Sequence, residues 1–144
     1  MTWVIDASVA AKWFLPEDGQ AEALALLDDR IERVAPDWIL AEIAHIAFKK
    51  WRDGEITRDH AQAMLSGFPD YLKRLHPSAD LVDRALFIAI TIRHPVYDCF
   101  YLAAAEASDG TVLTADQRFR NAAAGTAWSN RVRHLTSWQD ADPP

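Results

Sequence analysis

The sequence predicts an α/β fold in which helices cover both faces of a parallel central sheet, and two observations lead to this prediction. Short apolar runs of strand length alternate along the chain with longer segments that carry apolar residues at helical spacing. This alternation favours a parallel sheet buried between helical layers. The chain has 144 residues, half of them apolar, so we expect one substantial core and a single domain over 1–144.

The amino-terminal part is expected to form a strand and two helices. The segment "WVID" (3–6) is a short apolar run ending in an acid, and "ASVAAKWFL" (7–15) has helical spacing up to Pro16. Residues 17–31 have acids in the first turn, where the helix dipole favours them. Their expected apolar face consists of Ala21, Leu24, Leu27 and Ile31.

The rest of the chain continues the alternation. "RVAP" (33–36) favours a strand, and an amphipathic helix follows over 37–54, ending at Gly54. Thr57 can cap the next helix. The later elements are that helix to about residue 65, an extended piece within 70–77, helices over 79–94 and 97–108, a strand over 111–114, a helix over 115–124, a strand over 131–135 and a fraying tail over 140–144.

Composition narrows the class of protein. A single cysteine, Cys99, excludes an internal disulfide framework and a cysteine-rich zinc site. No window approaches the roughly 20 uncharged apolar residues of a membrane helix, so we expect a cytoplasmic protein without membrane contact. The net charge of −6 argues against a broad positive surface for nucleic acid, but not against a nuclease whose carboxylates hold cations.

Two acids follow predicted strands. Asp6 ends the first strand, and Asp116 comes two residues after "TVLT". Ligands of an open parallel sheet gather beyond the carboxyl ends of its strands, so both acids are expected to point into that groove. Each could instead cap the helix that follows. Ser8 and Thr114, each two residues from one of these acids, could hold the carboxylates or a metal-bound water, or bond to local backbone.

Two further acids lie on helix faces that are otherwise apolar. Glu42 comes three residues after Ile39, and Asp98 comes three residues before Tyr101. The ordinary alternatives are a glutamate at the edge of an apolar stripe and a first-turn acid favoured by the helix dipole. A shared site for Mg²⁺ or Mn²⁺, which prefer carboxylate oxygen, explains all four acids together.

With these acids placed, the sequence resembles PIN-domain proteins, and specifically the VapC toxins of bacterial toxin–antitoxin pairs. The resemblance rests on "VIDASVAAKWFLPE", "APDWILAEIAHIA" and "HPVYDCFYLAAAEASDGTVLTADQRFRNAA", and it covers nearly the whole chain. The acidic and small hydroxyl positions of the family fall on Asp6, Glu42, Asp98, Asp116, Ser8 and Thr114.

The resemblance implies a PIN-like α/β/α sandwich and a toxin that is a Mg²⁺- or Mn²⁺-dependent endoribonuclease. In such an enzyme Asp6, Asp98 and Asp116 would bind metal. Glu42 would bind metal directly or through water and help to deprotonate the attacking water. The resemblance also implies a VapB-type antitoxin whose tail occupies the groove, and a homodimer.

Two surface expectations accompany this function. Residues 110–136 contain four arginines and one acid, a local charge of 4 − 1 = +3. Arg118 is expected to contact the phosphate of the RNA substrate, the alternative being an ordinary exposed helix residue. The apolar run Trp13–Leu15 either belongs to the core, which is the commoner use of such residues, or forms a surface for the protein partner.

Two other classes of protein stay open. A PIN-like module that only binds RNA or protein would be expected to have lost an acid, and this chain keeps all four. A phosphoacceptor receiver domain would need an acidic pair after the first strand and a lysine after the last. Here Ala7 follows Asp6, and Thr136 and Ser137 follow "RVRHL".

Overall fold

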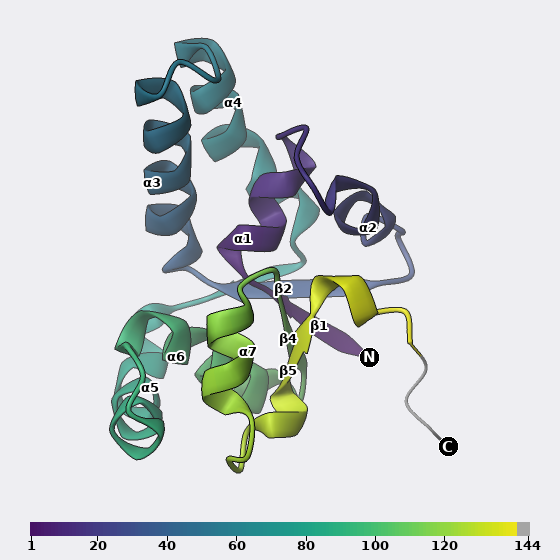
Figure 1. The fold of residues 1–144 in the computed structure, drawn as a ribbon. Helices are drawn as coiled ribbons and strands as arrows, with labels where there is room; N and C mark the ends of the chain where they lie inside the picture. Colours follow the sequence, from purple (N-terminus) through teal and green to yellow (C-terminus); the bar gives the residue numbers. More distant parts are fainter. Residues whose placement is uncertain (141–144) are drawn as a thin grey trace.

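The computed structural model describes residues 1–140, and its centre is a sheet of five parallel strands (Figure 1). The strands lie in the order β3-β2-β1-β4-β5, so β1 pairs with β2 on one side and with β4 on the other. Their bounds are β1 Thr2–Ile5, β2 Glu32–Pro36, β3 Arg74–His76, β4 Thr111–Thr114 and β5 Val132–His134. The predicted parallel sheet is confirmed.

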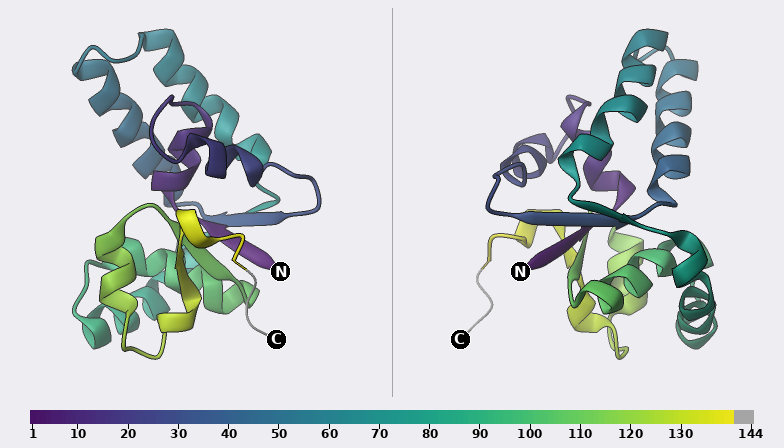
Figure 2. Two further views of the ribbon diagram at one scale, coloured as in Figure 1. Left: turned by 45° about the vertical axis from the view of Figure 1, so that its right-hand side comes forward. Right: turned by 180° about the vertical axis from the view of Figure 1, so that it is seen from behind.

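Helices cover both faces of the sheet (Figures 1 and 2). One layer consists of α1 Ala7–Ala10, α2 Gln20–Ala25, α3 Ile39–Arg52 and α4 Arg58–Gly67, and the other of α5 Ser78–Ile92, α6 Val96–Ser108 and α7 Gln117–Ala123. Short 3-10 turns lie at Ala11–Trp13, Phe68–Tyr71, Ser129–Arg131 and Leu135–Ser137. This arrangement is the expected α/β/α sandwich.

Helix α6 is the central helix of its layer. It packs across β1, β2 and β4, and α5 packs along its side. Every residue of Cys99–Ala105 is therefore buried, as in a helix that is enclosed on nearly all sides. This packing fixes the first turn of α6, which carries Asp98, against the middle of the sheet.

Helices α3 and α4 form a hairpin that projects beyond the sheet (Figure 2). Gly54 lies in the connection with φ of +75°, a conformation that a residue without Cβ adopts readily. Thr57 caps α4 as predicted, because its hydroxyl accepts a hydrogen bond of 3.1 Å from the backbone N–H of His60. The hairpin therefore begins beside the sheet and ends in solvent.

The helix predicted over 17–31 is shorter than expected, and its predicted apolar face is only partly correct, since Leu27 and Ile31 pack against the core but the other two residues do not. Gly19 has φ of +88°, and α2 covers only Gln20–Ala25. The chain then turns, with the backbone N–H of Arg30 bonded at 2.9 Å to the side chain of Asp28. Because the helix is short and starts after this glycine, it turns Ala23 and Leu26 inward and leaves Ala21 and Leu24 exposed.

The run Trp13–Leu15 belongs to the core, so the expectation that it forms a partner surface is wrong. Trp13 and Leu15 are only 7% and 3% exposed. The indole N–H of Trp13 donates to the carbonyl of Ala23 at 2.8 Å, and the ring of Tyr71 packs edge-on against it at 5.5 Å. Helix α2 and the turn before β3 thus cover the run.

The other predicted elements are present with small shifts of their ends. The segment 7–15 divides into α1 and a 3-10 turn, while the strand over 111–114 is found as predicted. Of the tail expected to fray over 140–144, residues 141–144 lie outside the described residues, while the backbone N–H of Asp140 donates to the carbonyl of Ser137 at 3.2 Å. Across residues 1–140, none of the helices has the length and apolar character needed to cross a membrane.

Candidate active site

The candidate site lies at the carboxyl end of β1 and β4, where the strand order changes direction. After β1 the chain goes on to β2 at one side, whereas β4 pairs with the other side of β1. Such a point is where open α/β sheets bind their ligands. Asp6 follows β1 directly, and its backbone N–H donates to the carbonyl of Leu113 on β4 at 3.0 Å. The local fold thus fixes the backbone of Asp6.

Two hydroxyl groups hold the Asp6 carboxylate. Thr114 donates to Asp6 Oδ2 at 2.6 Å, and Ser8 donates to the same oxygen at 3.0 Å. Each hydroxyl oxygen also accepts a hydrogen bond from a backbone N–H. The N–H of Asp116 donates to Thr114 Oγ1 and the N–H of Ala115 donates to Ser8 Oγ, both at 3.0 Å. Ser8 and Thr114 therefore lie where the sequence predicted them, and they link the two strand ends through Asp6.

Glu42 lies in the first turn of α3 and points toward the same region. Its Oε1 is buried and has no hydrogen-bond partner among the described residues. The charges of Asp6 and Asp98 both act on it, so it lies near both acids. The hydroxyl of Tyr101, on α6, is also buried and makes no well-formed hydrogen bond within residues 1–140, but it lies close enough to Glu42 to lower the pKa of that carboxyl. Burial and the charges of Asp6 and Glu42 in turn raise the pKa of Tyr101. A buried, unpaired carboxylate oxygen is costly for the protein alone.

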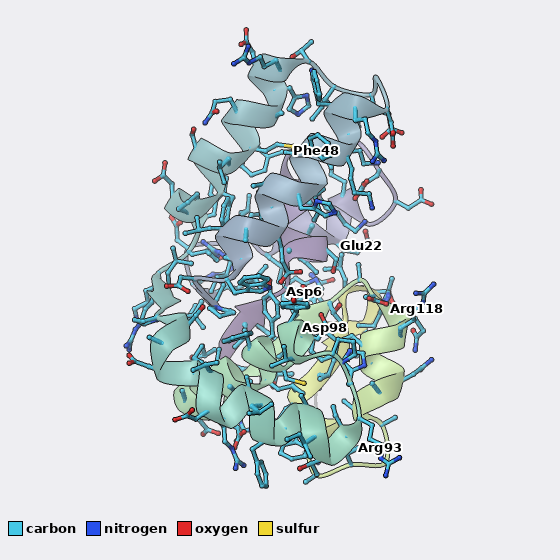
Figure 3. The ribbon with its side chains drawn as sticks, turned by 90° about the vertical axis from the view of Figure 1, so that its left-hand side faces the viewer. Asp6, Glu22, Phe48, Arg93, Asp98 and Arg118 are labelled. Carbon is cyan, nitrogen blue, oxygen red and sulfur yellow. The ribbon has the colours of Figure 1, made fainter. Side chains whose placement is uncertain are left out.

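Asp98 lies in the first turn of α6, close to Asp6 (Figure 3). Its Oδ2 accepts a hydrogen bond of 2.6 Å from Nε2 of His94, four residues earlier. The imidazole of His94 in turn contacts the ring of Phe119 on α7 at 5.8 Å. The first turn of α6 thus places Asp98 at the edge of its helical layer, on the side that faces Asp6.

Asp116 differs from the other three acids because it is exposed and caps a helix. Its Oδ1 accepts the backbone N–H of Arg118 at 2.9 Å, which is the N-cap alternative raised for it. Asp6 precedes α1 but makes no such cap hydrogen bond. Asp116 still lies near enough for its charge to raise the pKa of Asp98. It therefore borders the site as well as capping α7.

Burial and mutual repulsion shift three of these carboxyl groups in one direction. Burial raises the pKa of Asp6 to about 6, against the opposing hydrogen bond from Thr114. Burial, together with the charge of Asp6, raises the pKa of Glu42 to about 8. Burial also raises the pKa of Asp98, although the hydrogen bond from His94 opposes it. No Lys or Arg within residues 1–140 is among the causes of these shifts, so ionising the three acids together costs free energy.

The chemistry of these side chains fits a hard divalent cation. Carboxylate oxygens are the ligands that Mg²⁺ and Mn²⁺ prefer, and the unpaired Oε1 of Glu42 is a buried acceptor that a cation would satisfy. Within residues 1–140, however, no three Asp, Glu, His or Cys side chains are gathered closely enough to hold a metal ion as they stand. Cation binding would therefore draw the acids closer together.

Arg118 is exposed on α7, beyond Asp98 and at the solvent side of the site (Figure 3). Among the basic residues of the 110–136 segment, it is the nearest in sequence to an acid of the site, two residues after Asp116. Arg131 lies just before β5, at the other end of the sheet from Arg118, and its side chain pairs with Asp109 at 2.9 Å. The local positive charge predicted for this segment is thus divided between two ends of the sheet.

Sequence reasoning missed two neighbours of the acids, His94 and Tyr101. The spacing of four residues between His94 and Asp98 was a signal for a contact, but Pro95 separates two helices there and hides it. Tyr101 was recognised as part of the packing face, but its hydroxyl points toward Asp6 and Glu42 only because α6 crosses the middle of the sheet.

Comparison with known proteins identifies the family to which this fold belongs. The family described as PIN domain matches residues 3–125. The chain therefore belongs to the PIN domain family. Over 120 residues it is 31% identical to Ribonuclease VapC3 of Pyrobaculum aerophilum, an alignment that covers 82% of this chain and 92% of that protein. This likeness places it with the VapC-type ribonucleases of the family.

Solved structures show the same fold at low sequence identity. The crystal structure of PAE2754 from Pyrobaculum aerophilum matches 95% of this chain and 85% of its own, with a TM-score of 0.67 and 18% identity. VapBC2 from Rickettsia felis, bound to a DNA fragment from its promoter, matches 93% and 98%, with a TM-score of 0.62 and 13% identity. VapBC-1 from nontypeable Haemophilus influenzae matches 94% and 99%, with a TM-score of 0.61 and 13% identity.

Proposed function

We propose that this protein is an endoribonuclease that acts as the toxin of a toxin–antitoxin pair in the cytoplasm, and that residues 1–144 work as one domain. One observation carries the proposal. The buried carboxylate of Asp6 is held by Thr114 and Ser8 where β1 meets β4, and Glu42 and Asp98 lie close enough for their charges to interact with it. Membership of the PIN domain family and the likeness to a VapC ribonuclease support it.

Asp6, Glu42, Asp98 and Asp116 would hold Mg²⁺ or Mn²⁺. When bound, such a cation lowers the pKa of a coordinated water and stabilises the negative charge that develops on a phosphate. The residues of the chain supply the rest. Asp6 is oriented by two hydroxyl donors, and Asp98 by His94. We assign Glu42 Oε1 to accepting the proton of the attacking water, because it is buried and unpaired.

Arg118 is assigned to the phosphate backbone of the RNA. Its backbone is fixed by the cap hydrogen bond to Asp116, and its side chain is exposed at the solvent side of the site. A guanidinium contact to a phosphate oxygen positions the strand without reading its sequence. The assignment gives the exposed end of α7 a role in binding rather than in the chemical step.

The proposal is tested by incubating partner-free protein with total RNA in the presence of Mg²⁺, Mn²⁺ or EDTA. Discrete fragments that form only with a divalent cation are expected. RNA that stays intact under every condition, while the folded protein still binds it, would favour the alternative of a catalytically silent PIN-like module.

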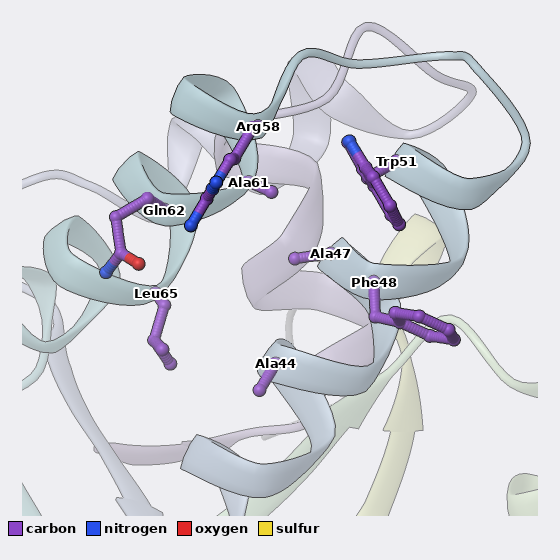
Figure 4. Close-up of a pocket in the computed structure, with 8 residues that line it drawn as sticks. All are labelled: Ala44, Ala47, Phe48, Trp51, Arg58, Ala61, Gln62 and Leu65. Carbon is purple, nitrogen blue, oxygen red and sulfur yellow. The ribbon is translucent and has the colours of Figure 1, made fainter.

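We propose that the antitoxin, whose tail is expected in the groove at the acids, also docks in a second groove, between α3 and α4. This groove, about 370 Å³, has three alanines in its floor and the half-exposed rings of Phe48 and Trp51 at its rim (Figure 4). Arg58 lies on its other side. Small residues flanked by aromatic rings leave room for large apolar side chains of a partner segment. Exposed aromatic side chains of this kind are typical of protein interfaces rather than of free surfaces.

Trp51→Ala is expected to abolish copurification of the co-expressed antitoxin. Trp51 is 49% exposed, so its loss removes partner contact rather than core packing. It lies nine residues after Glu42, about 13 Å along α3, so RNA cleavage by the partner-free variant should be unchanged. Trp51→Phe, which keeps an aromatic ring, is the matched control. Retention of the antitoxin by Trp51→Ala would contradict docking at this groove.

We propose that the homodimer forms through a different surface, the outer face of α5. Val82, Leu86, Phe87 and Ile90 are 44%, 54%, 52% and 69% exposed, and their spacing places them along one face of the helix. The double change Leu86→Glu and Ile90→Glu is expected to convert a dimer into a monomer in size-exclusion chromatography with light scattering. Leu24→Glu, a change of the same kind at a 44% exposed leucine on α2 in the other layer, should leave the mass unchanged. A dimer that survives the double change would exclude this face.

A further inference from the structure

Three aromatic rings form a stack directly beside the acids. The rings of Trp38 and Tyr97 lie 5.0 Å apart between centroids and within 9° of parallel. The ring of Phe100 also lies against that of Trp38, with 6.1 Å between centroids and 21° between the planes. Phe100 is buried, whereas Tyr97 is 54% exposed at the open end. Trp38 therefore contacts a buried ring of the core and a tyrosine ring that is open to solvent.

The same two helix starts hold the rings and the acids. Trp38 precedes Glu42 by about one turn at the beginning of α3, and Tyr97 precedes Asp98 directly at the beginning of α6. The contact between Trp38 and Tyr97 therefore joins the two elements that carry Glu42 and Asp98. A substrate whose phosphate lies at these acids must have a neighbouring part within reach of the rings.

A pocket of about 360 Å³ opens against this stack. It is lined by Trp38, Ala41, Glu42, His45, Ile46 and Tyr97. Most of its lining is apolar, and Glu42 supplies the edge that faces the site. Pockets with apolar or aromatic walls and few polar groups suit flat, partly polar ligands.

We propose that this pocket receives one unpaired nucleobase of the RNA, adjacent to the phosphate that is cleaved, and that Tyr97 and Trp38 provide its stacking wall. The inference rests on the proposed function and deepens it. Bases that are splayed out of single strands or loops stack on aromatic side chains, whereas paired bases in an A-form helix are not available for this. The rings are already stacked on each other, so little side-chain freedom is lost when a base is added.

A nucleobase fits this pocket better than a protein segment does. Glu42 is one of its walls, so an occupant of the pocket lies beside the groups assigned to the reaction. The groove between α3 and α4 is a separate cavity that shares no lining residue with it and has the small-residue floor expected for side chains of a protein. The pocket thus belongs to the path of the substrate.

The test combines a protein change with a substrate change. Cleavage of an unstructured oligoribonucleotide containing the mapped cleavage site is measured with wild type, Tyr97→Ala and Tyr97→Phe. Each protein is also given the same strand with single abasic nucleotides placed on either side of the cleaved bond. We expect Tyr97→Ala to lower kcat/KM by about 5- to 100-fold and to weaken binding similarly, while Tyr97→Phe stays near wild type.

The inference is tested by whether the effects of the Tyr97 substitution and of the abasic nucleotide on kcat/KM add together. One abasic position should lower kcat/KM for wild type but have little further effect on Tyr97→Ala, because both remove the same contact. Full additivity at both positions, with unchanged melting temperatures, would overturn the proposal. So would a Tyr97→Ala variant with wild-type RNA kinetics that no longer retains the antitoxin, since the rings would then serve the protein interface.

The inference and the proposed function can fail separately. If wild type cleaves no RNA, the nuclease proposal fails, and fluorescence anisotropy of the labelled oligoribonucleotide then tests the pocket. A weaker affinity of Tyr97→Ala for the intact strand, with no difference for the abasic strand, would still support base stacking. Equal affinities of wild type and Tyr97→Ala would overturn it.

Discussion

Asp6→Asn is expected to lower RNA cleavage by at least about 100-fold while the protein stays folded. Interactions between a metal centre and developing charge contribute several kcal/mol to a reaction, and each 1.36 kcal/mol corresponds to a tenfold change in rate. Asparagine keeps an oxygen that can accept the hydrogen bonds of Thr114 and Ser8, so the strand ends remain linked. The loss should therefore be in the chemistry and not in the fold.

The measurement compares cleavage rates of variants purified identically, together with their melting temperatures. Asp98→Asn should behave like Asp6→Asn, because Asp98 shares the site with it. Asp18→Asn, a change of the same kind at an exposed position, should cleave RNA at the wild-type rate. Residual cleavage by Asp6→Asn near the wild-type level would remove Asp6 from the centre, or reveal a contaminating ribonuclease.

The metal-free protein is expected to lose stability as pH rises from about 4 to about 8, and divalent cations should restore it. Asp6 has a pKa of about 6 in the folded state against 3.8, and Glu42 a pKa of about 8 against 4.5. Within this window the folded chain binds more protons than the unfolded chain, so its free energy of unfolding falls as protons are removed. Asp6 alone corresponds to a loss on the order of 3 kcal/mol.

Thermal melts from pH 4.5 to 8.5 in EDTA, and at the upper pH with added Mn²⁺ or Mg²⁺, measure this effect. The contribution of Asp6 alone should lower the melting temperature of wild type by roughly 6 to 12 °C across the window, Glu42 should add to the fall, and metal should reverse it. Asp6→Asn should show a flatter profile, a higher melting temperature than wild type at the upper pH, and a smaller response to metal. A wild-type stability that rises with pH and ignores divalent cations would contradict the proposed centre.

Most of the fold could be predicted from the sequence because its signals are local. Apolar runs, the Thr57 cap, Gly54 and Pro95 mark where elements begin and end, and the structure has elements at these places. The segment 17–31 could not be predicted well. Its helix is too short for periodicity to identify the buried face, and the start after Gly19 is set by packing against the neighbouring turn.

The candidate site was only partly predictable for a related reason. The strand-end position of Asp6 and its contacts with Ser8 and Thr114 follow from parallel-sheet topology, and the structure has them. The unpaired state of Glu42 Oε1 and the ring stack of Trp38 on Tyr97 depend on how α3 meets α6. Contacts between elements distant in sequence are set by tertiary packing, which a single sequence does not specify.

The place of β1 between β2 and β4 also determines when a growing polypeptide acquires its centre. Asp6, Glu42 and Asp98 are all synthesised before residue 111, but the strand that pairs with the free side of β1 and donates the Thr114 hydroxyl to Asp6 comes after it. A nascent chain therefore carries three of the four acids without the framework that aligns them. A cell translating this protein therefore meets the assembled centre only after Thr114 has been made and β4 has paired with β1.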